Sequence, residues 1–148
     1  MGKTSVLTRG LAVIGTALVW LPLVLALMFG IVRTVEIGRL HGDWLLPAEL
    51  FPLALVGGLM LLWAARRARS RLALIGWSLV VAVALLFGGQ ALAVVTGLAS
   101  GETPAVGWQW AIVTAMIIGY AVATAVIGVG GLLLVRDLRR KRASLKLL

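Results

Sequence analysis

Four side chains in the sequence form a candidate ligand site, namely those of Arg33, His41, Glu49 and Gln90. The first three lie within residues 33–49, between the first two apolar runs of the sequence. Gln90 lies 19 residues beyond Arg71, roughly 28 Å along a helix. Arg71 belongs to a loop at one side of the membrane, so we expect Gln90 near the opposite side, where residues 33–49 are also expected. Charged and polar groups at membrane depth suit recognition of a polar ligand or gating of a solute. The alternative is ordinary headgroup contact and solvated loop charges.

Metal, haem and nucleophilic chemistry fit the sequence poorly. His41 is the only histidine and the chain has no cysteine. A zinc site would have to combine His41 with Asp43 and Glu36, yet one histidine in a polar loop is usually solvated. The glycine-rich stretch 128–131 lies inside an apolar run without a preceding strand, which argues against phosphate binding. We therefore expect no metal and no cofactor, and the sequence favours a non-enzymatic protein.

Small residues recur in the last apolar run and predict close helix packing. The pairs 119/123, 121/125 and 124/128 have the small-xxx-small spacing that lets two helix backbones approach each other. The helix-packing candidates are Gly119, Ala121, Ala123, Ala125 and Gly128. They would pack against other helices of the same chain or against a second copy.

Hydroxyl side chains within the apolar runs are weak evidence for a pore. A threonine or serine inside a helix bonds back to the carbonyl of its own preceding turn. We expect this of Thr16, Ser78, Thr96, Thr114 and Thr124.

The composition is typical of a membrane protein and indicates which elements position the candidate residues. The 148 residues are 61% hydrophobic and 13% charged, with a mean hydropathy of +1.09. Soluble domains carry about 45–50% apolar and about 25% charged residues. Four long stretches contain no charged residue and no histidine, namely 10–32, 50–65, 72–101 and 103–135. About 20 apolar residues span a bilayer as a helix, so the sequence predicts four spans.

The net charge of +9 lies at the ends of these runs, which argues against nucleic-acid binding. Arg66, Arg67, Arg69 and Arg71 separate the second and third runs, and a basic tail occupies 136–148. Loops rich in arginine stay cytoplasmic, so both termini should be cytoplasmic. A second span beginning at Pro47 gives 19 residues, enough to cross.

The predicted fold is an all-α, four-helix transmembrane bundle, N-in/C-in, with two in–out–in hairpins. Residues 1–148 form one integral membrane domain with spans at about 10–32, 47–65, 72–97 and 108–135. We expect a plasma (inner) membrane protein whose arginines and tail meet anionic headgroups. It would act through helix packing as a scaffold or accessory subunit that can form homo-oligomers. The alternative function is a small transport or ligand-binding module with its polar site at the outer end.

Overall fold

The computed structural model describes residues 2–37, 51–101, 104 and 106–145, which form four helices and no strand. The helices are α1 (Gly2–Ile37), α2 (Phe51–Ala68), α3 (Leu72–Val95) and α4 (Trp108–Leu145). All four are long and apolar enough to cross a membrane. The prediction of an all-α chain with four potential spans is therefore confirmed.

The helices extend beyond the predicted spans where charged residues follow. Helix α1 begins at Gly2, not at residue 10, and α4 continues through the basic segment to Leu145. Charge limits the part of a helix that can enter hydrocarbon but does not end the helix itself. Helix α2 is described from Phe51, so the predicted start at Pro47 lies outside the described residues.

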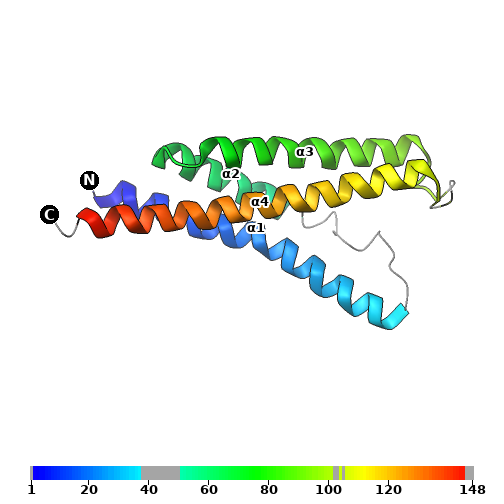
Figure 1. Cartoon of the computed structure of the whole chain (residues 1–148), viewed down its shortest axis with the longest axis horizontal. Helices are drawn as coiled ribbons and strands as arrows, with labels where there is room; N and C mark the ends of the chain where they lie inside the picture. The colour runs from blue at the N-terminus through cyan, green and yellow to red at the C-terminus, as the bar shows by residue number, and fades with distance from the viewer. Residues whose placement is uncertain (1, 38–50, 102–103, 105, 146–148) are drawn as a thin grey trace.

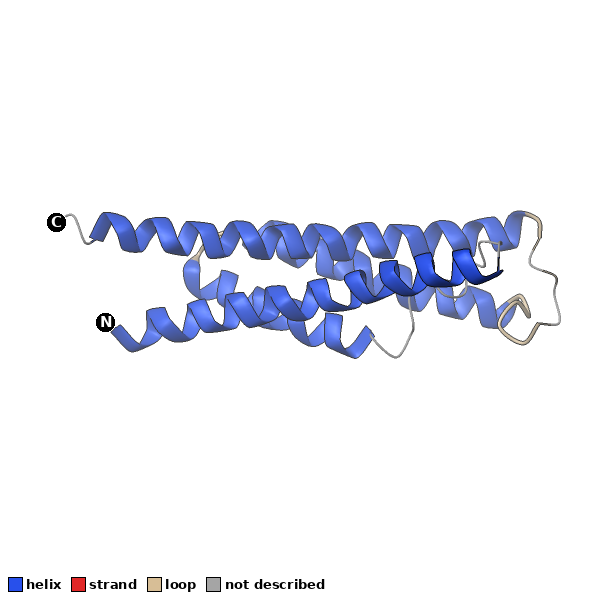
Figure 2. Ribbon diagram, turned by 90° about the horizontal axis from the view of Figure 1, so that it is seen from below, coloured by secondary structure: helices blue, strands red, loops and turns tan. Residues whose placement is uncertain are grey.

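The four helices form an elongated bundle in which α3 and α4 run side by side (Figure 1). The N-terminal end of α1 and the C-terminal end of α4 lie at the same end of this bundle (Figures 1 and 2). Helix α1 packs on α2 and α4 and diverges from α3 and α4 toward its own C-terminus. The short α2 is joined to α3 by the three residues 69–71.

The core has few large side chains and is made mainly of alanine and glycine contacts. The largest fully buried side chains in the described residues come one from each helix: Val19, Leu61, Ile75 and Leu134. Large apolar side chains are exposed on the outer faces of all four helices. A lipid environment accommodates such faces, and helix association in lipid relies on close van der Waals packing instead of hydrophobic exclusion.

Candidate functional site

The predicted outer cluster is not assembled by the residues that the structure describes. Glu49 and His41 lie outside the described residues, and Arg33 is described only as part of the backbone of α1. Gln90 is in α3 and is exposed. The ligand site of Arg33, His41, Glu49 and Gln90 therefore stays a prediction.

Helices α1 and α2 cross at close range at two glycines. A Cβ atom built on Gly15 would lie 2.9 Å from the carbonyl oxygen of Gly57, and a Cβ on Gly57 would lie 2.9 Å from the carbonyl oxygen of Gly15. Backbone atoms cannot move aside as a flexible side chain can. Only glycine fits at both positions without a shift of the backbone.

The candidates in α4 face different neighbours. Gly119 faces Leu85 of α3, whose Cδ1 would lie 3.0 Å from an added Cβ. Gly128 faces Trp20 of α1, with Nε1 at 2.8 Å from an added Cβ. Ala123 is buried, and Ala121 and Ala125 are half-buried.

Two further glycines in α4 complete the internal contacts. Gly130 faces Leu74 and Ile75 of α3. Gly131 faces Thr16 of α1 and Leu61 of α2. The glycines of α4 are therefore in contact with all three other helices of the same chain.

The predicted hydrogen bonds of hydroxyl groups to their own helices are confirmed for Thr16, Thr96 and Thr124. Thr16 Oγ1 donates to the carbonyl of Ala12 at 2.6 Å, and Thr124 Oγ1 donates to the carbonyl of Tyr120 at 2.8 Å. Thr96 Oγ1 likewise donates to the carbonyl of Leu92 at 2.7 Å. These bonds leave the hydroxyls little capacity to line a hydrated path.

Aromatic rings join three helices toward the end opposite the termini. The Phe51 ring of α2 lies 6.0 Å from the Phe87 ring of α3 in an edge-to-face arrangement. The same Phe51 ring lies 6.3 Å from the Tyr120 ring of α4. Edge-to-face and tilted rings are favourable packing geometries, so Phe51 fixes the first turn of α2 against α3 and α4.

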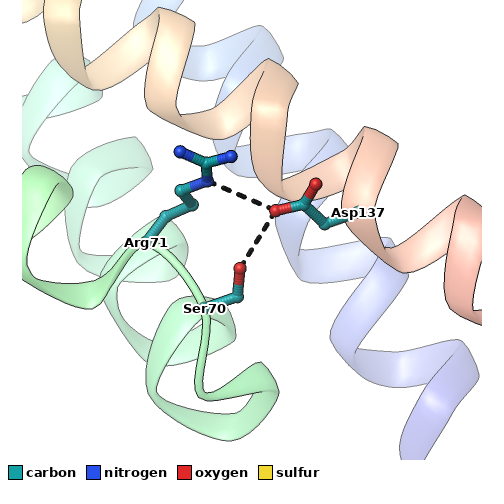
Figure 3. Close-up of polar contacts among 3 residues, drawn as sticks. All are labelled: Ser70, Arg71 and Asp137. Atoms are coloured by element: carbon teal, nitrogen blue, oxygen red, sulfur yellow. Dashed lines mark hydrogen bonds and ion pairs between the residues drawn. The ribbon is translucent and has the colours of Figure 1, made fainter.

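A polar contact at the basic end of the bundle was not foreseen from the sequence. Asp137 of α4 accepts hydrogen bonds through one carboxylate oxygen, Oδ2, from Ser70 Oγ at 3.0 Å and Arg71 Nε at 3.3 Å (Figure 3). The signal available was that Asp137 is the only acidic residue in the otherwise basic segment 136–148. The contact connects the α2–α3 turn to α4 across 66–67 residues of chain.

Among the described residues, no three His, Asp or Glu side chains lie together as a group that could hold a metal ion. The chain matches no family model, no curated protein and no solved structure.

Proposed function

We propose that this chain is an integral membrane protein that acts through helix packing, as a scaffold or accessory subunit of a membrane assembly. The observation that carries the proposal is the nature of the interior. Its glycines are in direct contact with neighbouring helices, and its threonines bond to their own backbones. An interior of this kind supports a rigid bundle whose outer faces contact lipid or other helices.

The proposed orientation places the α2–α3 turn and both termini in the cytoplasm, in a plasma (inner) membrane. Arg66, Arg67, Arg69 and Arg71 lie at or next to this turn, and the basic end of α4 contacts it through Asp137. The described part of the α3–α4 connection, residues 96–101, 104 and 106–107, carries no basic side chain. This asymmetry is the distribution that sets topology in small membrane proteins.

Cysteine labelling tests this arrangement cleanly because the chain has no cysteine of its own. We expect a membrane-impermeant maleimide to label Ser100→Cys in intact cells and to label Arg69→Cys only after permeabilisation. The cysteine-free parent chain serves as the control. Labelling of both positions from the same side would refute the topology, and recovery of the chain in the soluble fraction without detergent would refute membrane insertion.

Self-association belongs to this proposal through the outward face of α4. The exposed Val122, Val126 and Val129 and the half-buried Ala125 present short side chains to the bilayer. Short side chains let a second helix approach closely. We expect Val122→Trp with Val129→Trp to reduce oligomer size in detergent without unfolding the chain. An oligomer of unchanged size would remove this face from the proposal.

A further inference from the structure

The basic end of the bundle carries far more positive than negative charge. We call its seven exposed arginines the arginine corner: Arg66, Arg67, Arg69, Arg71, Arg136, Arg139 and Arg140. Asp137 is the only carboxylate in the described sequence between or beside them. Seven guanidinium groups against one carboxylate leave six positive charges to be balanced by an anionic partner.

The corner lies at the depth of lipid headgroups. The guanidinium carbon of Arg67 lies 5.8 Å from the centroid of the Trp63 ring, and the Trp63 side chain is 58% exposed. Exposed tryptophans at the end of an apolar helix prefer the membrane–water interface. Insertion of Trp63 at the membrane–water interface would bring the arginines that follow it to the level of the lipid phosphates.

Arg71 contacts Asp137 through a single nitrogen, Nε. Its Nε donates to Asp137 Oδ2, and its two terminal nitrogens point away from the carboxylate (Figure 3). A guanidinium has five N–H donors in a planar fork that matches two phosphate oxygens at once. The Arg71 side chain remains 43% exposed, so part of its surface is open to a partner.

The backbone of the turn is held in an unfavourable conformation at two arginines. Arg69 and Arg71 have φ angles of 49° and 59°, in the left-handed region where glycine is preferred. Residues held in such conformations cluster at ligand clamps and other functional sites. Arginine at both positions favours a role for these side chains that glycine could not supply.

We propose that the arginine corner binds the phosphate of an anionic phospholipid, with Arg71 as the principal ligand and Asp137 as the residue that positions it. The charge imbalance, the exposed tryptophan beside Arg67 and the partly exposed guanidinium of Arg71 together match a negatively charged headgroup. This site rests on the proposed membrane insertion but not on the proposed scaffold role.

A substitution that keeps the charge distinguishes a specific site at Arg71 from nonspecific electrostatic attraction between the arginines and the lipid. The full chain in a neutral detergent is titrated with phosphatidylglycerol, and bound lipid is followed by native mass spectrometry and by the unfolding midpoint. Arg71→Lys keeps the charge but removes Nε and the planar fork, so we expect affinity to fall about tenfold or more. Arg140→Lys is the matched control and should leave affinity unchanged. Equal affinity of the Arg71→Lys and parent chains would overturn the proposal.

The sign of the Asp137→Ala effect gives a second, independent test. Diffuse attraction predicts about fivefold tighter binding, because the variant has one negative charge fewer. A positioned Arg71 predicts weaker binding, because the guanidinium loses the carboxylate that orients it. Ser70→Ala keeps the Arg71–Asp137 pair and should weaken binding by no more than about threefold. Tighter binding by Asp137→Ala would contradict the positioning role.

Two further titrations, with phosphatidylcholine and with inorganic phosphate, identify the chemical class of the ligand. Phosphatidylcholine should give no comparable shift in the unfolding midpoint. Inorganic phosphate at the same concentration should also give none, and an equal shift would refute the assignment to lipid. Failure of lipid binding with intact cysteine labelling overturns only this site, whereas failed labelling overturns the membrane topology as well.

Discussion

At the residue scale, the stability of this bundle depends on glycines, which have no Cβ atom and so let two helices approach each other. Gly15 and Gly57 allow two helix backbones to touch. A Cβ added to either residue would lie 2.9 Å from the carbonyl oxygen of the other. In lipid, where burial of apolar surface provides little driving force between helices, such close approaches supply the packing energy. The same argument applies less strongly to Gly119, because the neighbouring Leu85 Cδ1 is the end of a flexible side chain.

Alanine substitutions at the α1–α2 crossing test this directly. We expect Gly15→Ala and Gly57→Ala each to lower the free energy of unfolding by about 1–3 kcal/mol, because the helices must separate. The measurement is unfolding by sodium dodecyl sulfate followed by tryptophan fluorescence.

Gly10→Ala is the matched control within the same helix. An added Cβ at Gly10 meets nothing within 4 Å. Because alanine favours helix over glycine, this variant should be neutral or more stable by up to about 1 kcal/mol. Equal losses at residues 10, 15 and 57 would show that the crossing has no special role.

At the scale of the element, α2 is held near both of its described ends by contacts with other helices. It has 18 described residues against 36 in α1 and 38 in α4. Its first residue, Phe51, contacts rings in α3 and α4, and its last turn leads into the turn that Asp137 holds. Both ends of the shortest helix are therefore fixed by contacts with longer ones.

Removal of the Phe51 ring should loosen the start of α2. Each aromatic pair contributes about 0.5–1.5 kcal/mol, so we expect Phe51→Ala to destabilise the bundle by about 1–3 kcal/mol in the same unfolding assay. Phe29→Ala removes a ring that is 53% exposed on α1 and should have little effect. A Phe29→Ala loss as large as that of Phe51→Ala would argue against the aromatic contact as the anchor.

At the scale of the whole molecule, we expect the distribution of charge to set the orientation of the bundle across the membrane. The arginines of the α2–α3 turn lie at the same end as the N-terminal end of α1 and the basic end of α4. Four helices joined in this order require that these three regions share one side of the membrane if each helix crosses once.

Neutralising the turn should therefore disturb topology. With Arg66, Arg67, Arg69 and Arg71 all changed to Gln, we expect a cysteine at Ser100 to be labelled from both sides of the membrane, because the charge bias is reduced. Changing Arg139 and Arg140 to Gln, further from the turn, should leave a larger share correctly oriented. An unaltered single-sided pattern in the fourfold variant would show that the turn does not set orientation.

The outer polar residues provide a test between the scaffold and transport hypotheses. Under the proposed function, Glu49→Gln and Gln90→Leu should leave folding and assembly size unchanged, because a scaffold has no solute to bind and the Gln90 side chain is exposed on α3. A solute flux in liposomes that is present in the parent chain and lost in both variants would favour the transport module instead.

The sequence by itself determined the four helices, since charge-free runs of sufficient length can satisfy their backbone groups in lipid only as helices. It also determined that Thr16, Thr96 and Thr124 bond to their own helices, which is a local matter of four residues. The tertiary structure alone decided which small residues face inward. Because a lipid-facing surface is as apolar as a buried one, the sequence pattern cannot tell the crossing at Gly15 and Gly57 from an outward face. The Ser70–Arg71–Asp137 contact required the fold for a different reason: its partners are 66–67 residues apart, and only the packing of α4 beside the α2–α3 turn brings them together.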